Sequence, residues 1–465
     1  MRDILNPINE KGVTDMDIKI TLLALGCSKN LIDCENMSTE LKNAGYEVIN
    51  DVAESDIVVI NTCGFIESAK KEAIDAILEC ADYKVPNGNV KKIIVSGCLS
   101  QRYPEDILKE LPEVDAVLGT AHYGDIVDVV AKLVSEIGNE STEKINLTSG
   151  VGGFSHLVKD REISTEAYAW LKIGEGCRHR CSFCAIPLIR GSFVSRPMED
   201  IIEEAKIIAG KGIKEIVLAA QDTTNYGIEL YGERCLSKLL RKLSEIDGIE
   251  LIRVMYGYMD GITDDLIEEI ANNPKVAHYL DIPIQHGSDK ILKAMYRRDN
   301  AELITARLEK IRNAIPDCII RTTVMVGFPG ETEEDFEIMK DNLRKWKFDR
   351  LGCFIFSPEE GTPAFDLPDQ IDDETKQRRY DEIYELQKEI SAEQSKKRLG
   401  QVTKVNICSV SDDGIFYIGR SYGESPEVDP VIYIASQDGE LQIGDFVEAK
   451  IVDCSDDYDM TAVTV

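Results

Sequence analysis

Positive charge and long apolar runs are both scarce in this chain. Its 465 residues include 53 Lys and Arg against 84 Asp and Glu, which gives a formal net charge of −31. A surface this acidic repels nucleic-acid phosphate as a whole, although a local basic groove could still bind it, and it attracts basic partners. Solubility alone is an equally good reason for the acidity. Nucleic acid is therefore not expected as the direct substrate.

No stretch of about 18 apolar residues occurs, so we expect no membrane-spanning helix. The first residues, MRDILNPINEKGVTDMD, are polar and lack the apolar core of a secretory signal. The chain nevertheless contains thirteen cysteines. Without a signal for export, these predict a protein of the reducing cytoplasm, where thiols bind metals more often than they pair as disulfides.

Three of the cysteines fall within eight residues of one loop. Cys177, Cys181 and Cys184 follow an apolar stretch that ends in a glycine turn. Three thiolates on one tight loop can hold three corners of a cubane iron–sulfur cluster and leave the fourth iron open to a small molecule. A zinc site would need a fourth protein ligand, which His179 or His286 could supply. Chance clustering of structural thiols is the third alternative.

The first 140 residues predict an open, doubly wound α/β domain with a parallel sheet. Near-continuous apolar runs suit strands buried on both faces, and amphipathic helical stretches lie between them. The runs are residues 18–25, 57–60, 93–95 and 116–118.

Another three cysteines each follow one of these strands directly: Cys27 in ALGC, Cys63 in INTC and Cys98 in VSGC. Open parallel sheets bind ligands beyond the carboxyl ends of their strands, and neighbouring strands lie about 4.8 Å apart. The three thiols are therefore expected to converge on one metal cluster. Each of them alone would more often be a small buried residue. Cys34 and Cys80 lie on apolar helix faces, where we expect them to be part of the core.

Residues 141–166 are rich in turn formers and predict a linker. From 167 to 372, strands alternate with helices and predict an incomplete (βα)6 barrel, whose chemistry belongs to loops at the carboxyl ends of its strands. The loop of Cys177 follows the first strand, as this rule requires. After the fifth predicted strand, residues 319–326, Thr332 and Asp335 resemble a helix capping box. The expected strands are residues 167–173, 215–220, 251–256, 279–284, 319–326 and 351–356.

Other loops at the same rim carry polar or glycine-rich sequence. Residues 221–224 follow the second strand, Gln285 and His286 end the fourth, and Gly327 and Gly330 follow the fifth. Because glycine lets backbone approach a ligand closely, Gln285, Gly327 and Gly330 are candidate cofactor-binding residues. Taken singly, each loop suits an ordinary turn, and only the shared rim favours the cofactor role. His286 suits a scaffold role equally well.

The chain ends in a charged linker helix over 373–399 and a set of short strands over 400–465, which predict a small antiparallel β-barrel. This last segment has three Lys and Arg against thirteen Asp and Glu. A barrel that grips RNA should present basic and aromatic side chains. An acidic barrel suits a basic protein instead, through complementary charge.

The whole layout resembles the radical S-adenosylmethionine (SAM) methylthiotransferases, from about residue 18 to the end. The loop spacing Cys-x-x-x-Cys-x-x-Cys, with Phe183 before its last cysteine, matches the radical SAM signature. The resemblance implies a SAM-bound 4Fe–4S cluster on the loop trio, an accessory 4Fe–4S cluster on the strand-end trio, and a carboxy-terminal domain of the TRAM type. The loop trio is Cys177, Cys181 and Cys184, and the strand-end trio is Cys27, Cys63 and Cys98.

Two branches of this family differ in substrate. One modifies adenosine in transfer RNA, and the other modifies an aspartate of ribosomal protein twelve of the small subunit. Segments such as LALGCSKNLIDCE, INTCGFIESAK and YLDIPIQHGSDKILKAM resemble the second branch. Ser28, where that branch often has proline, and Gly257 with Met259, where a proline turn is usual, depart from it. The transfer-RNA branch is the alternative, and a non-enzymatic, zinc-bearing adaptor is a third possibility.

For the ribosomal-protein branch the resemblance also implies a mechanism. SAM binds the open iron of the first cluster, and its reductive cleavage gives a 5′-deoxyadenosyl radical that removes hydrogen from the aspartate β-carbon. That carbon is not acidic enough for a general base at neutral pH, which explains the use of a radical. The accessory cluster holds the sulfur to be inserted, and a second SAM donates the methyl group. Sulfur-donor and reductant proteins are the implied further partners.

Overall fold

The computed structural model describes residues 18–138, 143–437, 439–455 and 458–465. The polar amino-terminal segment 1–17 lies outside them. The chain divides into two compact units. One comprises the residues up to Glu162 together with Leu188–Gly191, and the other comprises Ile163–Pro187 and Ser192–Val465. In the described part of the chain, no helix is both long and apolar enough to cross a membrane.

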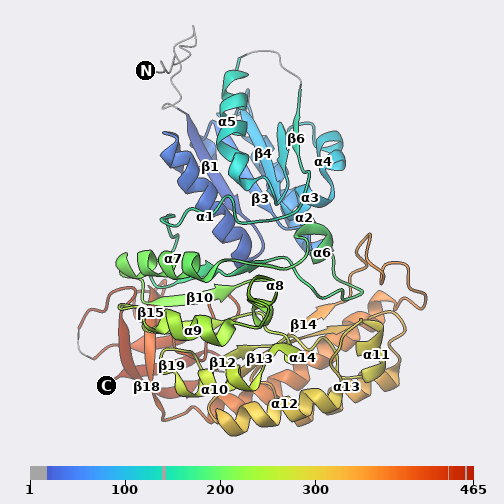
Figure 1. Cartoon of the computed structure of the whole chain (residues 1–465), viewed down its shortest axis with the longest axis vertical. Coiled ribbons are helices and arrows are strands. Elements are labelled where there is room, and N and C mark those ends of the chain that lie inside the picture. Colours follow the sequence, from blue (N-terminus) through green and yellow to red (C-terminus); the bar gives the residue numbers. More distant parts are fainter. Residues whose placement is uncertain (1–17, 139–142, 438, 456–457) are drawn as a thin grey trace. The chain divides into compact units, whose positions relative to one another are not determined.

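The first unit is a six-stranded parallel sheet with helices on both faces, in the strand order β2-β1-β3-β4-β5-β6 (Figure 1). Its strands are β1 (Lys19–Ala24), β2 (Glu47–Ile49), β3 (Ile57–Thr62), β4 (Lys92–Gly97), β5 (Ala116–Leu118) and β6 (Ile145–Leu147). Its helices are α1 (Ser28–Asn43), α2 (Glu67–Asp82), α3 (Cys98–Arg102), α4 (Pro104–Glu110) and α5 (Ile126–Ser135). The predicted doubly wound domain is confirmed.

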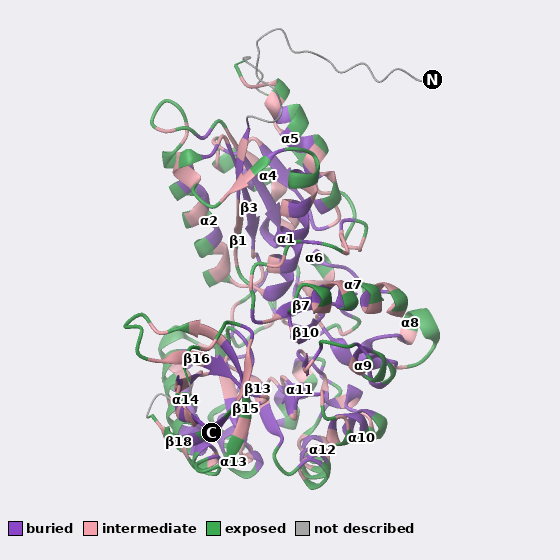
Figure 2. Cartoon of the chain, turned by 90° about the vertical axis from the view of Figure 1, so that its left-hand side faces the viewer, coloured by how far each residue is buried: buried purple, intermediate pink, exposed green. Residues whose placement is uncertain are grey.

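The two faces of this sheet have separate cores. Strand β3 is buried along its whole length, as its unbroken apolar run predicts. Ile57 and Val59 pack into a cluster with α1 and α5, whereas Val58 and Ile60 pack into a cluster with α2, α3 and α4. Figure 2 shows the buried strands between helices whose outer faces are exposed. The expected core cysteines, Cys34 and Cys80, lie in these two clusters.

The segment predicted as a linker is largely part of the first unit. Strand β6 lies within it and pairs with β5 at the edge of the sheet. Farther on, His156 Nε2 lies 3.0 Å from Asp33 Oδ1, and Arg161 Nε donates to Glu35 Oε2 at 3.0 Å. Turn-forming residues on both sides of a three-residue strand conceal it in the sequence.

The second unit begins with the six predicted parallel strands, which pair as two three-stranded sheets in the orders β11-β10-β7 and β12-β13-β14. They are β7 (Ala169–Lys172), β10 (Glu215–Ala219), β11 (Leu251–Val254), β12 (Tyr279–Asp281), β13 (Ile319–Val326) and β14 (Arg350–Ile355). The longer helices are α7 (Met198–Gly210), α9 (Leu236–Ser244), α10 (Asp264–Asn272), α12 (Ala301–Ala314), α13 (Glu333–Trp346) and α14 (Asp373–Lys396). Short elements are β8 (Gly174–Glu175), α6 (Ile186–Ile189), β9 (Val194–Ser195), α8 (Ile228–Tyr231) and α11 (Asp289–Ala294).

The last part of the second unit is a closed barrel in the order β15-β16-β17-β19-β18. Its strands are β15 (Val402–Val410), β16 (Tyr417–Arg420), β17 (Ile432–Ala435), β18 (Phe446–Cys454) and β19 (Met460–Thr464). The predicted small barrel is confirmed, with four antiparallel pairs and one parallel pair, β17 with β19. Strand direction cannot alternate around a closed ring of five, so one parallel pair is required.

A buried ion network on β10 holds this barrel to the parallel strands. Both carboxylate oxygens of Glu215 accept hydrogen bonds from Arg420, at 3.0 and 2.9 Å, and Asn406 donates to the same carboxylate at 2.9 Å. Arg253 lies on its other side at 3.4 Å. Burial opposes ionisation of Glu215, but Arg420 and Arg253 outweigh it and hold the pKa of Glu215 below its usual range.

Replacing Glu215 by Ala should destabilise the second unit by about 3–5 kcal/mol, because two buried arginines then lack their counter-charge. Urea unfolding followed by tryptophan fluorescence measures this, since both tryptophans, Trp170 and Trp346, belong to the second unit. The lowered pKa means that the stabilisation is present above pH 4.5, the usual pKa, and is lost as the pH falls through the folded-state value.

The matched control is Asp341→Ala, which breaks a 2.8 Å ion pair with Arg344 on the exposed face of α13. Such surface pairs contribute about 0–1 kcal/mol. Equal losses from the two substitutions would contradict the structural role of Glu215.

Candidate metal centres

The strand-end cysteines lie at the carboxyl ends of three neighbouring strands. Cys27 follows β1 as the N-cap of α1, Cys63 follows β3, and Cys98 follows β4 as the first residue of α3. Burial, together with the neighbouring thiols of Cys98 and Cys27, raises the pKa of the Cys63 thiol to about 12. The thiols of Cys27 and Cys98 are thus close enough to Cys63 to affect its ionisation, although the three cysteines are far apart in the sequence. Cys63 is protonated when free, so metal binding would release its proton.

Glycines beside these cysteines allow the three loops to approach closely. A Cβ atom on Gly26 would lie 2.5 Å from Cβ of Cys63, and one on Gly64 would lie 2.7 Å from Cα of Leu99. Gly26 also has a φ of +92°, in the region that favours glycine. Any side chain at these positions would push the loops apart, so glycine here lets the loops that carry the cysteines pack closely.

Asn30 ties together the ends of two of these strands. Its side-chain amide donates to the carbonyl of Leu25 at 2.8 Å and to the carbonyl of Thr62 at 3.1 Å. These carbonyls lie just before the loops of Cys27 and Cys63. Asn30 is fully buried, and its place in the segment GCSKN, on the first turn of a helix, gave no signal of this role.

The loop trio lies after β8 on one tight turn. The Cys184 amide donates to the Cys181 carbonyl at 3.1 Å, and Ser182 between them is held to the end of α11. There its amide donates to the carbonyl of Met295 at 3.1 Å and its hydroxyl donates to that of Ala294 at 2.8 Å. Burial raises the pKa of Cys177 to about 12 and raises the pKa of Cys184 as well.

An aromatic stack supports this loop. The centre of the His179 ring lies 3.7 Å from that of the Tyr258 ring, nearly parallel to it, and the Arg297 guanidinium carbon lies 4.3 Å from the Tyr258 ring centre. The Tyr258 hydroxyl is 3.6 Å from Cys181 Sγ. Burial raises the pKa of Tyr258, so its hydroxyl stays protonated and can donate to a thiolate. Asp222 holds His179 through a 2.8 Å contact.

Sequence reasoning missed Tyr258 and Arg297. The segment MYGYMDGIT departs from the family pattern, and no spacing rule links either residue to Cys181. Two N–H groups of Arg297, at Nε and Nη1, are buried without a hydrogen-bond partner, whereas its Nη2 binds Asp299 at 2.6 Å. Such donors are available to an anionic group.

The other predicted rim residues lie on two loops, Gln285 after β12 and the two glycines after β13. Gly327 and Gly330 have φ values of +75° and +78°, and a Cβ on Gly327 would meet the side chain of Lys376 at 2.3 Å. The group that approaches Gly327 closely is thus the side chain of Lys376. Gln285 also has a positive φ, +71°, which is unusual for a residue with a side chain. Their contact with a cofactor remains a prediction.

His286 is fully buried, and its Nδ1 accepts a hydrogen bond from the Ser288 amide at 2.9 Å. Among the described residues, no three His, Cys, Asp or Glu side chains gather closely enough to hold a single metal ion. The zinc alternative, with His179 or His286 as fourth ligand, therefore gains no support. In a cubane each thiolate binds a different iron, so its sulfurs need not surround one ion. Two sets of three thiols suit such clusters.

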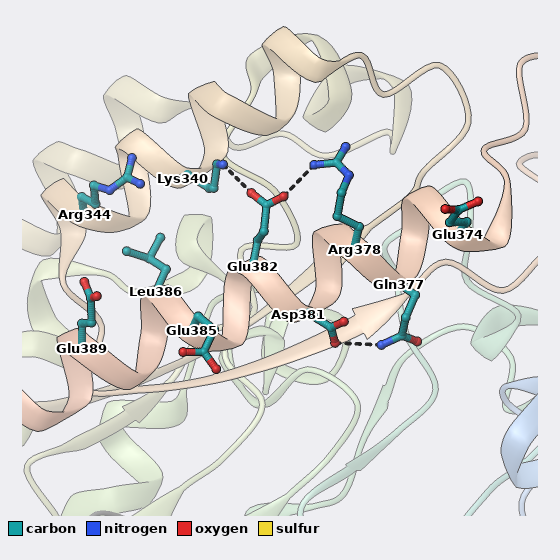
Figure 3. Close-up of a pocket in the computed structure, with 10 residues that line it drawn as sticks. All are labelled: Lys340, Arg344, Glu374, Gln377, Arg378, Asp381, Glu382, Glu385, Leu386 and Glu389. Atoms are coloured by element: carbon teal, nitrogen blue, oxygen red, sulfur yellow. Dashed lines mark hydrogen bonds and ion pairs between the residues drawn. The ribbon is translucent and has the colours of Figure 1, made fainter.

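A groove of about 700 Å³ lies apart from both trios in sequence, between α13 and α14 (Figure 3). Charged side chains line it, and Glu382 bridges Lys340 and Arg378 there. None of its lining residues is a cysteine, so it offers no thiolate for an iron–sulfur cluster.

Three family models match successive parts of the chain. The uncharacterized protein family UPF0004 matches residues 19–119, the radical SAM superfamily matches 171–343, and the TRAM domain matches 399–465. The first match spans the strand-end trio, and the second spans the loop trio.

Solved structures share the fold. A radical SAM methyltransferase, TsrM, from Kitasatospora setae has a TM-score of 0.56 at 13% identity, over 75% of this chain and 77% of that one. The cobalamin-dependent SAM radical enzyme OxsB has a TM-score of 0.51 at 15% identity, over 81% of this chain and 56% of that one.

Curated relatives align with nearly the whole chain. A protein of Acetivibrio thermocellus is 49% identical over 96% of this chain and 98% of its own length. One of Clostridioides difficile is 47% identical over 95% and 98%, respectively. Both are named ribosomal protein uS12 methylthiotransferase RimO. The chain therefore belongs to the RimO family of radical SAM methylthiotransferases.

Proposed function

We propose that this enzyme acts in the cytoplasm and transfers a methylthio group to the β-carbon of an aspartate in ribosomal protein uS12. The observation that carries the proposal is the presence of two cysteine trios in a chain whose relatives, at 42–49% identity, are named ribosomal protein uS12 methylthiotransferase. Each trio leaves one corner of a cubane without a protein ligand. Separate proteins would deliver the sulfur and the electrons.

As a member of this family, the enzyme uses an iron–sulfur cluster and SAM. In our proposal, the loop trio holds the SAM-bound cluster and the strand-end trio holds an accessory cluster. When bound, these groups supply a radical that removes hydrogen from an unactivated carbon, and a sulfur atom to replace it. The candidate SAM contacts are Gln285, Gly327 and Gly330.

The protein positions this chemistry and limits the access of water. Cys177 and Cys181 are buried, and the stack of His179, Tyr258 and Arg297 closes one side of their loop. The Tyr258 hydroxyl can donate to Cys181 in its thiolate form. The hydrogen bonds of Ser182 to the end of α11 keep the loop in a fixed shape. A fixed site limits side reactions of a radical with neighbouring groups.

The charge of the barrel supports a basic protein rather than RNA as substrate. Its single arginine, Arg420, is buried in the ion pair with Glu215 and is not available to phosphate. Lys404 and Lys450 are its exposed cations. This surface attracts a basic partner and repels a phosphate backbone. The exposed acids of the barrel, among the described residues, are Asp412, Asp413, Glu427, Glu440, Glu448 and Asp453.

Replacing Cys98 by Ala should lower methylthiolation by roughly 100-fold or more, since loss of even a supporting group costs a metal site about 10–100-fold. Reductive cleavage of SAM should be largely retained, because the loop trio is unchanged. Mass spectrometry of the peptide product and chromatography of 5′-deoxyadenosine measure the two activities separately.

The matched control is Cys80→Ala, which removes a buried thiol of the same unit that lies on α2 and belongs to the core. It should retain both activities. Full methylthiolation by the Cys98→Ala enzyme would refute the accessory assignment.

The reduced enzyme should methylthiolate a uS12 peptide that contains the target aspartate and leave transfer RNA unmodified, because the barrel lacks exposed arginine. The measurement is a mass gain of one methylthio group in place of one hydrogen. An Asp→Ala peptide is the control. Modification of transfer RNA alone would overturn the assignment in favour of the other branch.

A further inference from the structure

Arg190 is a buried arginine in contact with a cysteine of the strand-end trio. It is 3% exposed and belongs to the first unit through the short segment Leu188–Gly191. Its Nη2 atom lies 3.5 Å from Cys98 Sγ and donates to Asn30 Oδ1 at 2.7 Å. Its Nη1 atom donates to Asp33 Oδ2 at 3.0 Å. The guanidinium thus lies between a carboxylate and a thiol.

A cation buried in this way needs compensation, which Asp33 provides. Asp33 is fully buried, and its other oxygen lies 3.0 Å from His156 Nε2. The centre of the Tyr123 ring lies 5.8 Å from the guanidinium carbon. Arg190 and Asp33 therefore form a fixed dipole, and its positive end faces Cys98.

We propose that Arg190 is a positioning residue of the accessory cluster, which raises the reduction potential of that cluster through an N–H···S hydrogen bond to Cys98. This inference rests on the accessory cluster of the proposed function. It assigns a role to a side chain that supplies no metal ligand.

The direction of the effect follows from charge. Reduction adds one electron to the cluster and makes its sulfurs more negative, so a nearby cation and a hydrogen bond to sulfur stabilise the reduced form. A more stable reduced form means a higher potential. Asp33 works against Arg190, because its negative charge offsets part of the field at Cys98.

The two side chains should therefore shift the potential in opposite directions when each is neutralised. Arg190→Gln removes the cation and should move the midpoint potential to a more negative value. Asp33→Asn leaves the cation uncompensated and should move it to a more positive value. A purely structural role of the pair would instead disturb the site similarly in both variants.

The experiment uses the full-length chain with Cys177, Cys181 and Cys184 replaced by Ala, so that only the accessory cluster can assemble. After anaerobic reconstitution, a potentiometric titration followed by electron paramagnetic resonance gives the midpoint potential of the parent and of each variant. Absence of a cubane signal in the parent would contradict the accessory cluster of the proposed function. An unshifted potential in the variants would contradict only the role of Arg190.

Arg161→Gln is the matched control, because Arg161 is an equally buried arginine of the same unit that pairs with Glu35 at 3.0 Å. It should leave the potential unchanged. Unchanged potentials in both Arg190→Gln and Asp33→Asn, shifts of the same sign, or an equal shift in Arg161→Gln would overturn the proposal.

Arg190→Lys gives a second test if Arg190→Gln assembles no cluster. Lysine keeps the charge but lacks the planar fork that serves Asp33, Asn30 and Cys98 together. The midpoint potential of the Arg190→Lys variant should also be more negative than that of the parent, by a smaller amount than in Arg190→Gln. A potential equal to that of the parent would contradict the hydrogen bond to sulfur.

Discussion

The parallel pairing of β1, β3 and β4 is the constraint on which the first unit depends. It places the carboxyl ends of three strands side by side, and so brings together Cys27, Cys63 and Cys98 from loops about 35 residues apart in the chain. Antiparallel pairing would send alternate cysteines to opposite edges. Gly26 and Gly64 complete the arrangement, because side chains there would collide with the neighbouring loop. The parallel sheet therefore places the three cysteines at one edge, and the glycines allow their loops to pack closely.

Much of this arrangement could be predicted from the sequence, for identifiable physical reasons. Strands buried on both faces leave unbroken apolar runs, and a cysteine directly after such a run has a known place at the sheet edge. The capping box of Thr332 and Asp335 is predicted from local sequence and is present. Strand β6 and the parallel β17–β19 pair were missed, since the first is only three residues long and the second follows from closure of the whole barrel.

The supporting side chains were beyond prediction because their partners are distant in the chain. Tyr258 contacts Cys181 across 77 positions, and Arg190 contacts Cys98 across 92. No periodicity or spacing rule connects such pairs. The same holds for Glu215, which begins an apolar strand and binds Arg420 across 205 positions. A charged residue within an apolar run shows that a partner must exist, because burial of a lone charge is too costly, but it does not show which partner.

Arg190 illustrates how chain order can serve two units. The chain leaves the second unit after Pro187, contributes Leu188–Gly191 to the first, and returns at Ser192. Thr120 anchors this excursion by donating to the Ile189 carbonyl at 2.8 Å, and Ile189 is fully buried. The apolar segment AIPLIRG therefore contributes the cation Arg190 to the first unit, where it forms an ion pair with Asp33. That cation lies only six positions after the last cysteine of the loop trio. One short stretch of sequence thus contains both the loop trio and an arginine that contacts a cysteine of the strand-end trio.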